Sequence, residues 1–404
     1  MKNIVYTTNR GFPSNNIGGS NKIIYLLLKN INYDAYNPYY LSTSHFRKFE
    51  SKNDLEYRPI IINSNFSKKI LLKTDIINRI ISAYTYQKFY YFKKNRSFNN
   101  NLMSICNKLI HCHNPVALNL TVDATSKKIL TIHNKGSIIN DIYSGISNCS
   151  KGAFNYYRNL EIQAIKKADI ITFPSKVAKE VYFQDIGIEY AERKDIRIIY
   201  NGIDHQQIKN TTGYSRSELT LQIRSDFSKS INLINVADHV KLKNIDKLIL
   251  AIKDLVSIKK INIKLINIGS GPLTFNLQQM INENNLEDYI FLLGRVENTK
   301  VIKLLKAGDA LVMPSGKVVF DLVNLEALAS GLPLLLSKNG GNLEIMDEGK
   351  NGFYIEENTP KSIIQAIIKL INSNLKRGNI DMSKCVDVLA MVEQYENLYQ
   401  ELDF

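Results

Sequence analysis

Four side chains of this 404-residue sequence stand where an apolar stretch meets a loop or the start of a helix. His133 ends the apolar stretch KILTIH, and Lys243 begins the amphipathic stretch KNIDKLILAIKDL. Asp321 and Glu326 stand near the start of a second helical stretch, where the first backbone N–H groups have no partner within the helix. Helix N-termini and cations stabilise negative charge, and carboxylates accept hydrogen bonds from hydroxyls. The set suits a ligand that carries phosphate and hydroxyl oxygens.

A glycine pair near the N-terminus offers a second place for a phosphate. Gly18 and Gly19 lie in the loop GFPSNNIGGSN, between the strand-like KNIVYT and the helical KIIYLLLKNI. Glycine allows a phosphate to approach the backbone closely, and such a loop can present several N–H groups to it. Because turns use glycine freely, the pair is a weak signal by itself.

These residues depend on an alternation of strands and helices along the chain. In the first half, the pattern predicts strands at 2–7, 108–113, 128–133, 168–175 and 196–204, with a helix at 22–31. In the second half, it predicts strands at 231–238, 263–271, 289–294, 309–315 and 332–337, and helices at 243–255, 301–308 and 325–331. Such alternation indicates parallel, doubly wound sheets. The predicted fold class is α/β, with two Rossmann-like halves joined near residue 205.

The composition is that of a globular protein with two domains. The chain exceeds the usual size of a single hydrophobic core, and 44% of its residues are hydrophobic while 22% are charged. No apolar run approaches the roughly 18–20 residues that cross a bilayer. The start MKNIVYTTNR has no signal-peptide pattern, and the four cysteines have no CxxC spacing. We therefore expect a cytoplasmic protein with reduced thiols.

The net charge of +14 is confined to the first half of the chain. Residues 1–204 hold 29 Lys and Arg against 15 Asp and Glu, whereas residues 205–404 hold 23 of each kind. Such asymmetry predicts an anionic partner for the first half, either a membrane surface, an acidic acceptor or nucleic acid. The segment 67–96 carries eight Lys and Arg and one Asp among Ile, Leu, Phe and Tyr. It is typical of a basic helix on an anionic bilayer, or of a solvated helix that packs on the sheet. No nucleic-acid motif accompanies the charge, so we expect no nucleic-acid partner.

The segment Asp309–Ile345 carries a family resemblance. Its sequence DALVMPSGKVVFDLVNLEALASGLPLLLSKNGGNLEI reads as a strand, a loop, a helix, a second strand and a Gly-Gly turn. This pattern resembles the nucleotide-sugar-binding segment of the retaining glycosyltransferases of family 4, which have the GT-B fold. The stretches ADIITFPSKVAKEVYF, IIYNGID, GSGP (269–272) and LGRVEN (293–298) extend the resemblance over nearly the whole chain.

The resemblance implies a domain organisation. Two Rossmann-like doubly wound domains would face each other across a cleft, with residues 1–205 binding the acceptor and residues 206–385 binding the donor. The amphipathic tail 386–404 would return to pack on the first domain, for which Tyr395 and Tyr399 are suited. The alternative is that this helix covers its own domain.

The resemblance also implies roles for single residues. The catalytic set would be His133, which holds the donor sugar, Lys243, which clamps the diphosphate, and Glu326, which bonds the ribose hydroxyls. The donor-binding set would be Gly18, Gly19, Asp238, Gly269, Arg295, Val296, Phe320, Asp321, Leu322, Val323 and Glu326. The family needs no metal ion, and the nucleotide sugar is a substrate, so no cofactor is expected. His111 and His113 could pair on one strand face for a metal, but no third ligand is evident, and we interpret them as structural or acceptor-side.

At three positions the sequence departs from the family pattern. Asp238 stands where the family has Arg, Val318 where it has Glu, and Asp321 where it has Gly. A carboxylate beside a desolvated diphosphate is repulsive, so Asp238 points away, or a neighbour such as Lys241 compensates it, or the donor is unusual. Asp321 either offers its carboxylate to a donor hydroxyl or only caps the helix.

The expected function is sugar transfer with retention, from a nucleoside-diphosphate sugar to a lipid-linked or polyanionic glycan acceptor in bacterial surface polysaccharide synthesis. The protein would lie on the inner face of the plasma membrane. One alternative is a non-catalytic glycosyltransferase-like partner or scaffold. Another is a transferase that uses an atypical activated donor.

Overall fold

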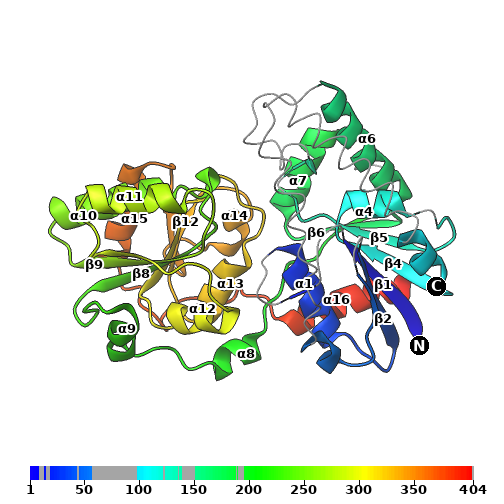
Figure 1. Ribbon diagram of the computed structural model, residues 1–404, viewed down its shortest axis with the longest axis horizontal. Coiled ribbons are helices and arrows are strands. Elements are labelled where there is room, and N and C mark those ends of the chain that lie inside the picture. The colour runs from blue at the N-terminus through cyan, green and yellow to red at the C-terminus, as the bar shows by residue number, and fades with distance from the viewer. Residues whose placement is uncertain are drawn as a thin grey trace. The chain divides into compact units, whose positions relative to one another are not determined.

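The computed structural model describes residues 1–8, 13–14, 19–42, 45–56, 98–121, 123–134, 136–138, 151–187, 189 and 195–402. The basic segment 67–96 and Gly18 lie outside these residues. The chain divides into two compact units, which we call unit 1 (residues 1–200 and 391–404) and unit 2 (residues 201–390) (Figure 1). The division at 200/201 lies five residues before the position read from the sequence.

Unit 1 is built on a seven-stranded sheet. Its strands are β1 (Lys2–Thr8), β2 (Tyr36–Ser42), β3 (Phe46–Lys48), β4 (Lys108–Cys112), β5 (Lys128–Thr131), β6 (Ile170–Phe173) and β7 (Asp195–Ile198). They lie in the order β3-β2-β1-β4-β5-β6-β7, and only β3 runs antiparallel to its neighbour. The central strands β4, β5 and β6 are buried along their whole length, as expected for a parallel sheet covered on both faces.

The helices of unit 1 follow its strands. Among the described residues they include α1 (Ser20–Asn30), the short 3-10 helix η1 (Lys52–Glu56), α4 (Pro115–Leu120), α6 (Lys151–Lys167) and α7 (Lys176–Ile186). Asn114 and Ser175 stand at the N-caps of α4 and α7, and their side chains accept a hydrogen bond from the first turn. These caps fix where each chain segment leaves the sheet and turns into a helix.

The last helix, α16 (Val388–Glu401), packs into unit 1 from the far end of the chain (red in Figure 1). Tyr395 and Tyr399 are fully buried there, and Tyr36 lies edge-on to Tyr399 at 5.8 Å between ring centres. The Glu396 carboxylate accepts a hydrogen bond of 2.7 Å from the backbone N–H of Asn32. Residues 388–390 remain with unit 2, because Val388 donates its backbone N–H to Ile203.

Unit 2 is built on a six-stranded parallel sheet. Its strands are β8 (Ile231–Val236), β9 (Ile263–Ile268), β10 (Ile290–Leu292), β11 (Ala310–Met313), β12 (Leu334–Ser337) and β13 (Gly352–Ile355), in the order β10-β9-β8-β11-β12-β13. Its helices are α8 (His205–Asn210), α9 (Arg216–Ile223), η3 (Lys241–Lys243), α10 (Ile245–Ser257), α11 (Thr274–Glu283), α12 (Asn298–Leu305), α13 (Leu322–Ala329), α14 (Asn342–Ile345) and α15 (Pro360–Ile371). Ser215 begins α9 with a capping box, and Thr359 caps α15 ahead of Pro360.

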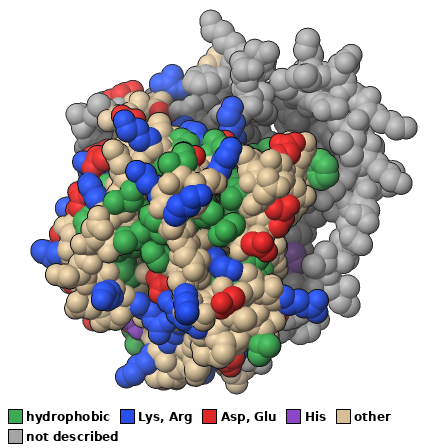
Figure 2. Space-filling model, turned by 90° about the vertical axis from the view of Figure 1, so that its left-hand side faces the viewer, with side chains coloured by type: hydrophobic (Ala, Val, Ile, Leu, Met, Phe, Trp, Pro, Cys, Tyr) green, Lys and Arg blue, Asp and Glu red, His purple; other side chains and the backbone are tan. Residues whose placement is uncertain are grey.

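One face of unit 2 combines apolar and basic side chains. Figure 2 shows hydrophobic side chains gathered near the middle of this face, among Lys and Arg side chains. Ile258, just after α10, and Phe275, in α11, are among the exposed large hydrophobic residues. Among the described helices, none has the length and apolar character that crossing a bilayer requires.

All ten strands predicted from the sequence are present, and the α/β fold class with two parallel sheets is confirmed. The sequence reasoning missed β2, β3 and β13, and it assigned no helix at α4, α6, α7, α8, α9, α11, α14 or α15. Pro38 lies in the middle of β2 and weakens its strand pattern, because proline cannot donate to a ladder. β13 begins with Gly352, a residue disfavoured in strands, and runs directly into two glutamates, so its sequence is a weak strand signal.

Candidate active site

The strand order of unit 2 contains one point where the chain changes direction across the sheet. From β8 the chain goes outward through β9 to β10, then returns to the other side of β8 with β11. In open parallel sheets, ligands bind outside the carboxyl ends of the strands at this switch point. The loops that leave it are residues 237–243, after β8, and 314–321, after β11. They contain Asp238, Lys243, Val318 and Asp321.

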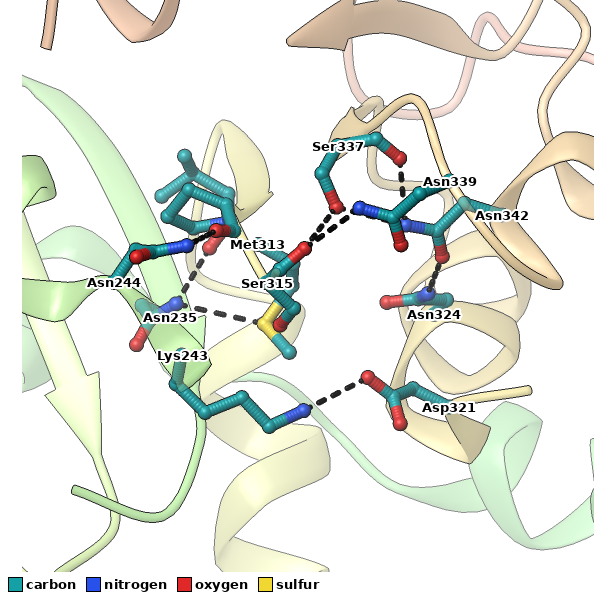
Figure 3. A network of polar contacts seen from close by, with 12 residues as sticks. Asn235, Lys243, Asn244, Met313, Ser315, Asp321, Asn324, Ser337, Asn339 and Asn342 are labelled. Atoms are coloured by element: carbon teal, nitrogen blue, oxygen red, sulfur yellow. Dashed lines mark hydrogen bonds and ion pairs between the residues drawn. The ribbon is translucent and has the colours of Figure 1, made fainter. Parts of the chain in front are cut away.

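Lys243 and Asp321 point toward each other across these two loops (Figure 3). The Lys243 ammonium nitrogen lies 3.0 Å from the Asp321 carboxylate oxygen Oδ2. Their side chains are 16% and 24% exposed, so the pair is largely but not fully removed from water. Lys243 ends η3, and Asn244, in a left-handed conformation, turns the chain into α10. The ammonium group is thereby held at the switch point.

Asp321 occupies the N-cap position of α13 without capping it. The Asp321 side chain accepts no hydrogen bond from the first turn of α13, and its carboxylate turns to Lys243 instead. The interpretation of Asp321 as only a helix cap is therefore wrong. Leu322 and Val323 begin the helix and are half-buried, so the uncapped N-terminal end lies beside the ion pair. A cation and a helix N-terminus together attract an anion.

The Gly-Gly turn fixes the backbone of the loop that carries Val318. Gly340 has φ +56°, and a Cβ there would overlap the carbonyl oxygen of Val318. Gly341 approaches the carbonyl oxygen of Val319 in the same way. Val318 is 8% exposed and Phe320 is 6% exposed, so both side chains pack into unit 2. Position 318, where the family has a carboxylate, is therefore apolar and largely buried in this chain.

A network of amide and hydroxyl groups holds the loop after β11 (Figure 3). The carbonyl oxygen of Ser315 accepts hydrogen bonds from Ser337 Oγ at 2.7 Å and from Asn339 Nδ2 at 2.9 Å. Asn324 Nδ2 donates to Asn342 Oδ1 at 3.0 Å, and Asn342 Nδ2 donates to the carbonyl oxygen of Ser337 at 2.8 Å. These bonds leave three buried atoms without a partner among the described residues: Ser315 Oγ, Asn324 Oδ1 and Asn339 Oδ1. Buried polar atoms normally have partners, so this group is suited to a polar ligand.

Glu326 lies one turn into α13 and is only 5% exposed. Its Oε1 accepts a hydrogen bond of 3.0 Å from Asn298 Nδ2, at the start of α12. A buried carboxylate needs such partners to stay charged. Asn298 thus fixes the rotamer of Glu326, a role that the sequence reasoning did not assign to it.

Asp238 belongs to an exposed ion pair. Its Oδ1 lies 2.7 Å from the guanidinium of Arg295, which also donates to Ser270 Oγ at 3.1 Å. The side chains of Asp238 and Arg295 are 61% and 69% exposed. The partner of Asp238 is therefore Arg295 and not Lys241, contrary to the expectation from its nearness in sequence. Gly269, with φ +147°, packs against the Ala237 carbonyl and brings the loop after β9 beside that after β8.

The histidines of unit 1 form a buried group of their own. His111 bonds through Nδ1 with the Tyr399 hydroxyl and through Nε2 with the Thr131 hydroxyl, both at 2.7 Å. Burial lowers the pKa of His111 to about 3, with a smaller contribution from the charge of His133. Since both ring nitrogens have protein partners, His111 is structural.

His113 connects this group to His133. Its Nδ1 lies 3.0 Å from His133 Nε2, and its ring stacks on that of His111 at 4.2 Å. Burial and the two neighbouring histidines hold the pKa of His113 well below its ordinary value. His133 is half-buried beyond the carboxyl end of β5, and Gly19 precedes α1 with φ 71°. Both sequence-predicted residues thus lie at the carboxyl edge of the unit 1 sheet.

The structure brings together only part of the predicted site. Lys243, Asp321 and the start of α13 adjoin, while Asp238 and Arg295 form a separate pair on the loops after β8 and β10. Sequence reasoning missed the supporting amides, which are Asn298, Asn324, Asn339 and Asn342. Asn324 could have been found, since it is the one polar residue between Leu322 and Leu325 in an apolar run.

Comparisons with known families agree with this arrangement. Residues 55–207 match the model of Glycosyltransferase Family 4, and residues 221–383 match that of Glycosyl transferases group 1. Two α/β units, each built on a mainly parallel sheet, are the architecture of the GT-B class, which solved structures such as HepE share. Together the two models and the glycosyltransferase relatives support a GT-B glycosyltransferase like those of family 4.

Individual relatives are distant. An uncharacterized glycosyltransferase of Methanocaldococcus jannaschii is 26% identical over 368 residues, which cover 89% of this chain and 90% of that protein. N-acetyl-alpha-D-glucosaminyl L-malate synthase of Bacillus anthracis is 27% identical over 218 residues, 52% of this chain and 54% of that protein. The chain thus spans little more than half the length of that relative. The crystal structure of Anabaena HepE in complex with UDP has a TM-score of 0.67 at 16% identity, covering 99% of this chain and 100% of that one.

Proposed function

We propose that the protein is a retaining, metal-independent glycosyltransferase that takes its sugar from a nucleoside-diphosphate sugar bound by unit 2. The observation that carries the proposal is the half-buried Lys243 ammonium at the switch point, beside the uncapped start of α13. A departing diphosphate develops negative charge, and fixed cations and helix N–H groups stabilise it. HepE, which shares the fold, has been crystallised with UDP and with UDP-glucose, which supports a nucleotide-sugar donor.

In this proposal each residue has one task. Lys243 and the N–H groups at the start of α13 hold the diphosphate. Glu326, oriented by Asn298, accepts hydrogen bonds from the ribose hydroxyls. His133 holds the donor sugar from unit 1. The acceptor hydroxyl attacks the anomeric carbon as the bond to the diphosphate breaks, and its proton passes to the leaving phosphate oxygen, so no protein base is needed.

Unit 1 would bind an anionic acceptor, such as a lipid-linked or polyanionic glycan in bacterial surface polysaccharide synthesis. The support is the net charge of +14, all of it in residues 1–204. The Bacillus anthracis relative is named for a product that contains L-malate, an organic acid. The protein would then work in the cytoplasm, on the inner face of the plasma membrane.

A transferase with an atypical activated donor is the second candidate. It is favoured by the apolar environment of Val318 together with the carboxylate of Asp321, which change the contacts open to the sugar. A non-catalytic partner of another glycosyltransferase is a third, for the same reason.

The test is calorimetric binding of UDP, GDP and ADP, followed by release of the nucleoside diphosphate from matching sugar donors in the presence of membrane extract. We expect one nucleotide to bind, and Glu326→Ala to weaken its binding while leaving that of a 2′,3′-dideoxy analogue unchanged. Glu287→Ala is the matched control, since this exposed carboxylate precedes β10 and so lies at the amino ends of the strands, away from the switch point. A folded protein that binds none of the three nucleotides would refute the proposal. Binding without turnover would favour the non-catalytic partner, and turnover of another donor class the second candidate.

A further inference from the structure

We propose that Lys243 and Asp321 form an exchange pair that distinguishes an intact nucleotide sugar from a bare nucleoside diphosphate. In the unliganded protein the two side chains neutralise each other. When the donor binds, Lys243 turns to the diphosphate, and the released Asp321 carboxylate accepts a hydrogen bond from a hydroxyl of the donor's sugar. This inference rests on the proposed function of the site.

The contacts of the two side chains show that each can change partner. Among the described residues, the Lys243 ammonium has one hydrogen-bond partner, Asp321, and an ammonium carries three donors. Asp321 accepts at Oδ2 only, and its carboxylate makes no bond to the first turn of α13. The two side chains therefore make no hydrogen bond or ion pair to any other described residue. Breaking the Lys243–Asp321 pair leaves no other hydrogen bond unmade.

The surroundings of the pair explain why a bare diphosphate would be disfavoured. A diphosphate that engages Lys243 at the start of α13 lies beside the Asp321 carboxylate, and two anions in a partly desolvated site repel each other. Val318 and Phe320, which precede Asp321 on the loop, are buried and apolar and supply no side-chain donor. The unpartnered amide oxygens Asn324 Oδ1 and Asn339 Oδ1 lie nearby, and an amide oxygen accepts hydrogen bonds but cannot donate one to a phosphate.

A sugar hydroxyl supplies the hydrogen-bond donor that Asp321 lacks once Lys243 has turned to the diphosphate. Hydroxyl groups donate hydrogen bonds, and a charged carboxylate is a strong acceptor for them. An intact donor therefore satisfies both members of the pair, Lys243 through its phosphate and Asp321 through its sugar. After transfer the sugar is gone, and the carboxylate again faces the diphosphate without a donor. The exchange pair thus favours substrate binding and product release at the same position.

The experiment compares Asp321→Asn with the wild-type protein, using UDP against UDP-glucose, GDP against GDP-mannose and ADP against ADP-glucose. An amide has the shape of the carboxylate but no charge, so it removes the repulsion and the ion pair together. For the pair of ligands that the wild type binds, we expect the variant to bind the nucleoside diphosphate about tenfold more tightly. Its affinity for the nucleotide sugar should stay the same or fall. The matched control is Asp288→Asn, which changes an exposed aspartate just before β10, at the amino ends of the strands.

The two proposals fail in different ways. If the wild-type protein, folded by its thermal unfolding curve, binds no nucleotide, the proposed function itself fails. If it binds nucleotide but Asp321→Asn weakens both ligands equally, or changes neither, the exchange pair is refuted and the ion pair is structural. In the double variant Lys243→Ala/Asp321→Asn, the gain in diphosphate affinity should disappear. A gain that persists there would overturn the role of Lys243.

Discussion

The two sheets have the same strand order around their first strands, yet their carboxyl edges are filled differently. In unit 1, His111 is fully buried and bonded on both ring nitrogens, by Thr131 of the sheet and by Tyr399 of the last helix. Beside it, His113 is bonded through Nδ1 only, and its Nε2 has no partner among the described residues. In unit 2, Lys243 and Asp321 are partly exposed and bonded only to each other, and three buried polar atoms nearby have no partner among the described residues.

The difference separates a structural polar group from a binding one. A buried side chain such as His111, whose polar atoms all have partners, rigidifies the fold, and a ligand that disturbs its bonds costs free energy. A group with spare donors or acceptors, partly open to water, can bind a ligand without that cost. Position at the carboxyl edge of a sheet is therefore not enough to mark a ligand site. Partial exposure to water, together with unused hydrogen-bonding groups, distinguishes the Lys243–Asp321 pair from the fully bonded His111.

The largest effect is expected from the loss of the Lys243 ammonium in unit 2. In Lys243→Ala, we expect nucleoside diphosphate affinity to fall about a hundredfold, since hydrogen bonds to charged groups contribute about 1.5–3 kcal/mol. The stability of unit 1 should not change. Calorimetric titration measures the affinity, and Lys259→Ala, an exposed lysine just beyond α10, is the control. A fall of less than threefold would mean that Lys243 is not the diphosphate cation.

Tyr399→Phe tests the buried histidine group of unit 1. The variant removes the hydroxyl that bonds His111 at 2.7 Å and Tyr6 at 3.2 Å, and leaves a buried ring nitrogen without a partner. We expect the free energy of unfolding of unit 1 to fall by about 1–3 kcal/mol, while nucleotide affinity stays unchanged. Urea unfolding measures the first effect. Tyr289→Phe, a half-buried tyrosine of unit 2 with no hydroxyl bond among the described residues, should have little effect. Equal losses in the two variants would contradict a structural role for the Tyr399 bond.

Acid should act on unit 1 through His111. Burial lowers its pKa from an ordinary 6.5 to about 3 in the folded protein, so between these values only the unfolded chain binds the proton. This contribution to stability is complete above pH 6.5 and is lost as the pH falls toward 3, at up to about 1.4 kcal/mol per pH unit. Near it lie Tyr6, Tyr395, Tyr399, His113 and His133, and the carboxylate of Glu396 acts on Tyr6 and Tyr399.

In His111→Asn, the unfolded chain takes up about one proton fewer in this pH range. The slope of the unfolding free energy against pH should therefore fall by up to about 1.4 kcal/mol per pH unit. Thermal unfolding between pH 7 and pH 5 measures the slope for the variant and for the wild type. An unchanged slope would show that His111 already binds its proton in the folded state.

The smallest effect is expected at the exposed pair of unit 2. Asp238→Asn breaks the ion pair with Arg295, whose two side chains are more than half exposed. We expect the free energy of unfolding to change by less than about 1 kcal/mol, because water screens such pairs. Urea unfolding in low and in high salt measures it. A larger, salt-sensitive loss would mean that this pair holds the loops after β8 and β10 together.

Much of the fold could be predicted because buried parallel strands are apolar along their whole length. Most of the ten predicted strands contain such an apolar run, whereas β2 carries Pro38 and β13 begins with glycine. The helix start near Leu322 followed from the change of pattern after Asp321. The partners of Asp238 and Asp321 could not be predicted, since Arg295 is 57 residues from Asp238 in the chain and Lys243 is 78 residues from Asp321.

The sequence by itself determined the fold class, the family and the positions of Lys243, Asp321 and Glu326 at the ends of predicted elements. These depend on local composition and spacing, which short-range physics converts into strands and helices. The tertiary structure alone decided which of these side chains meet, which are satisfied and which are left with unused donors or acceptors. Those properties arise where loops from distant parts of the chain converge, and a hydrogen bond depends on distances of a few ångströms that no linear spacing encodes.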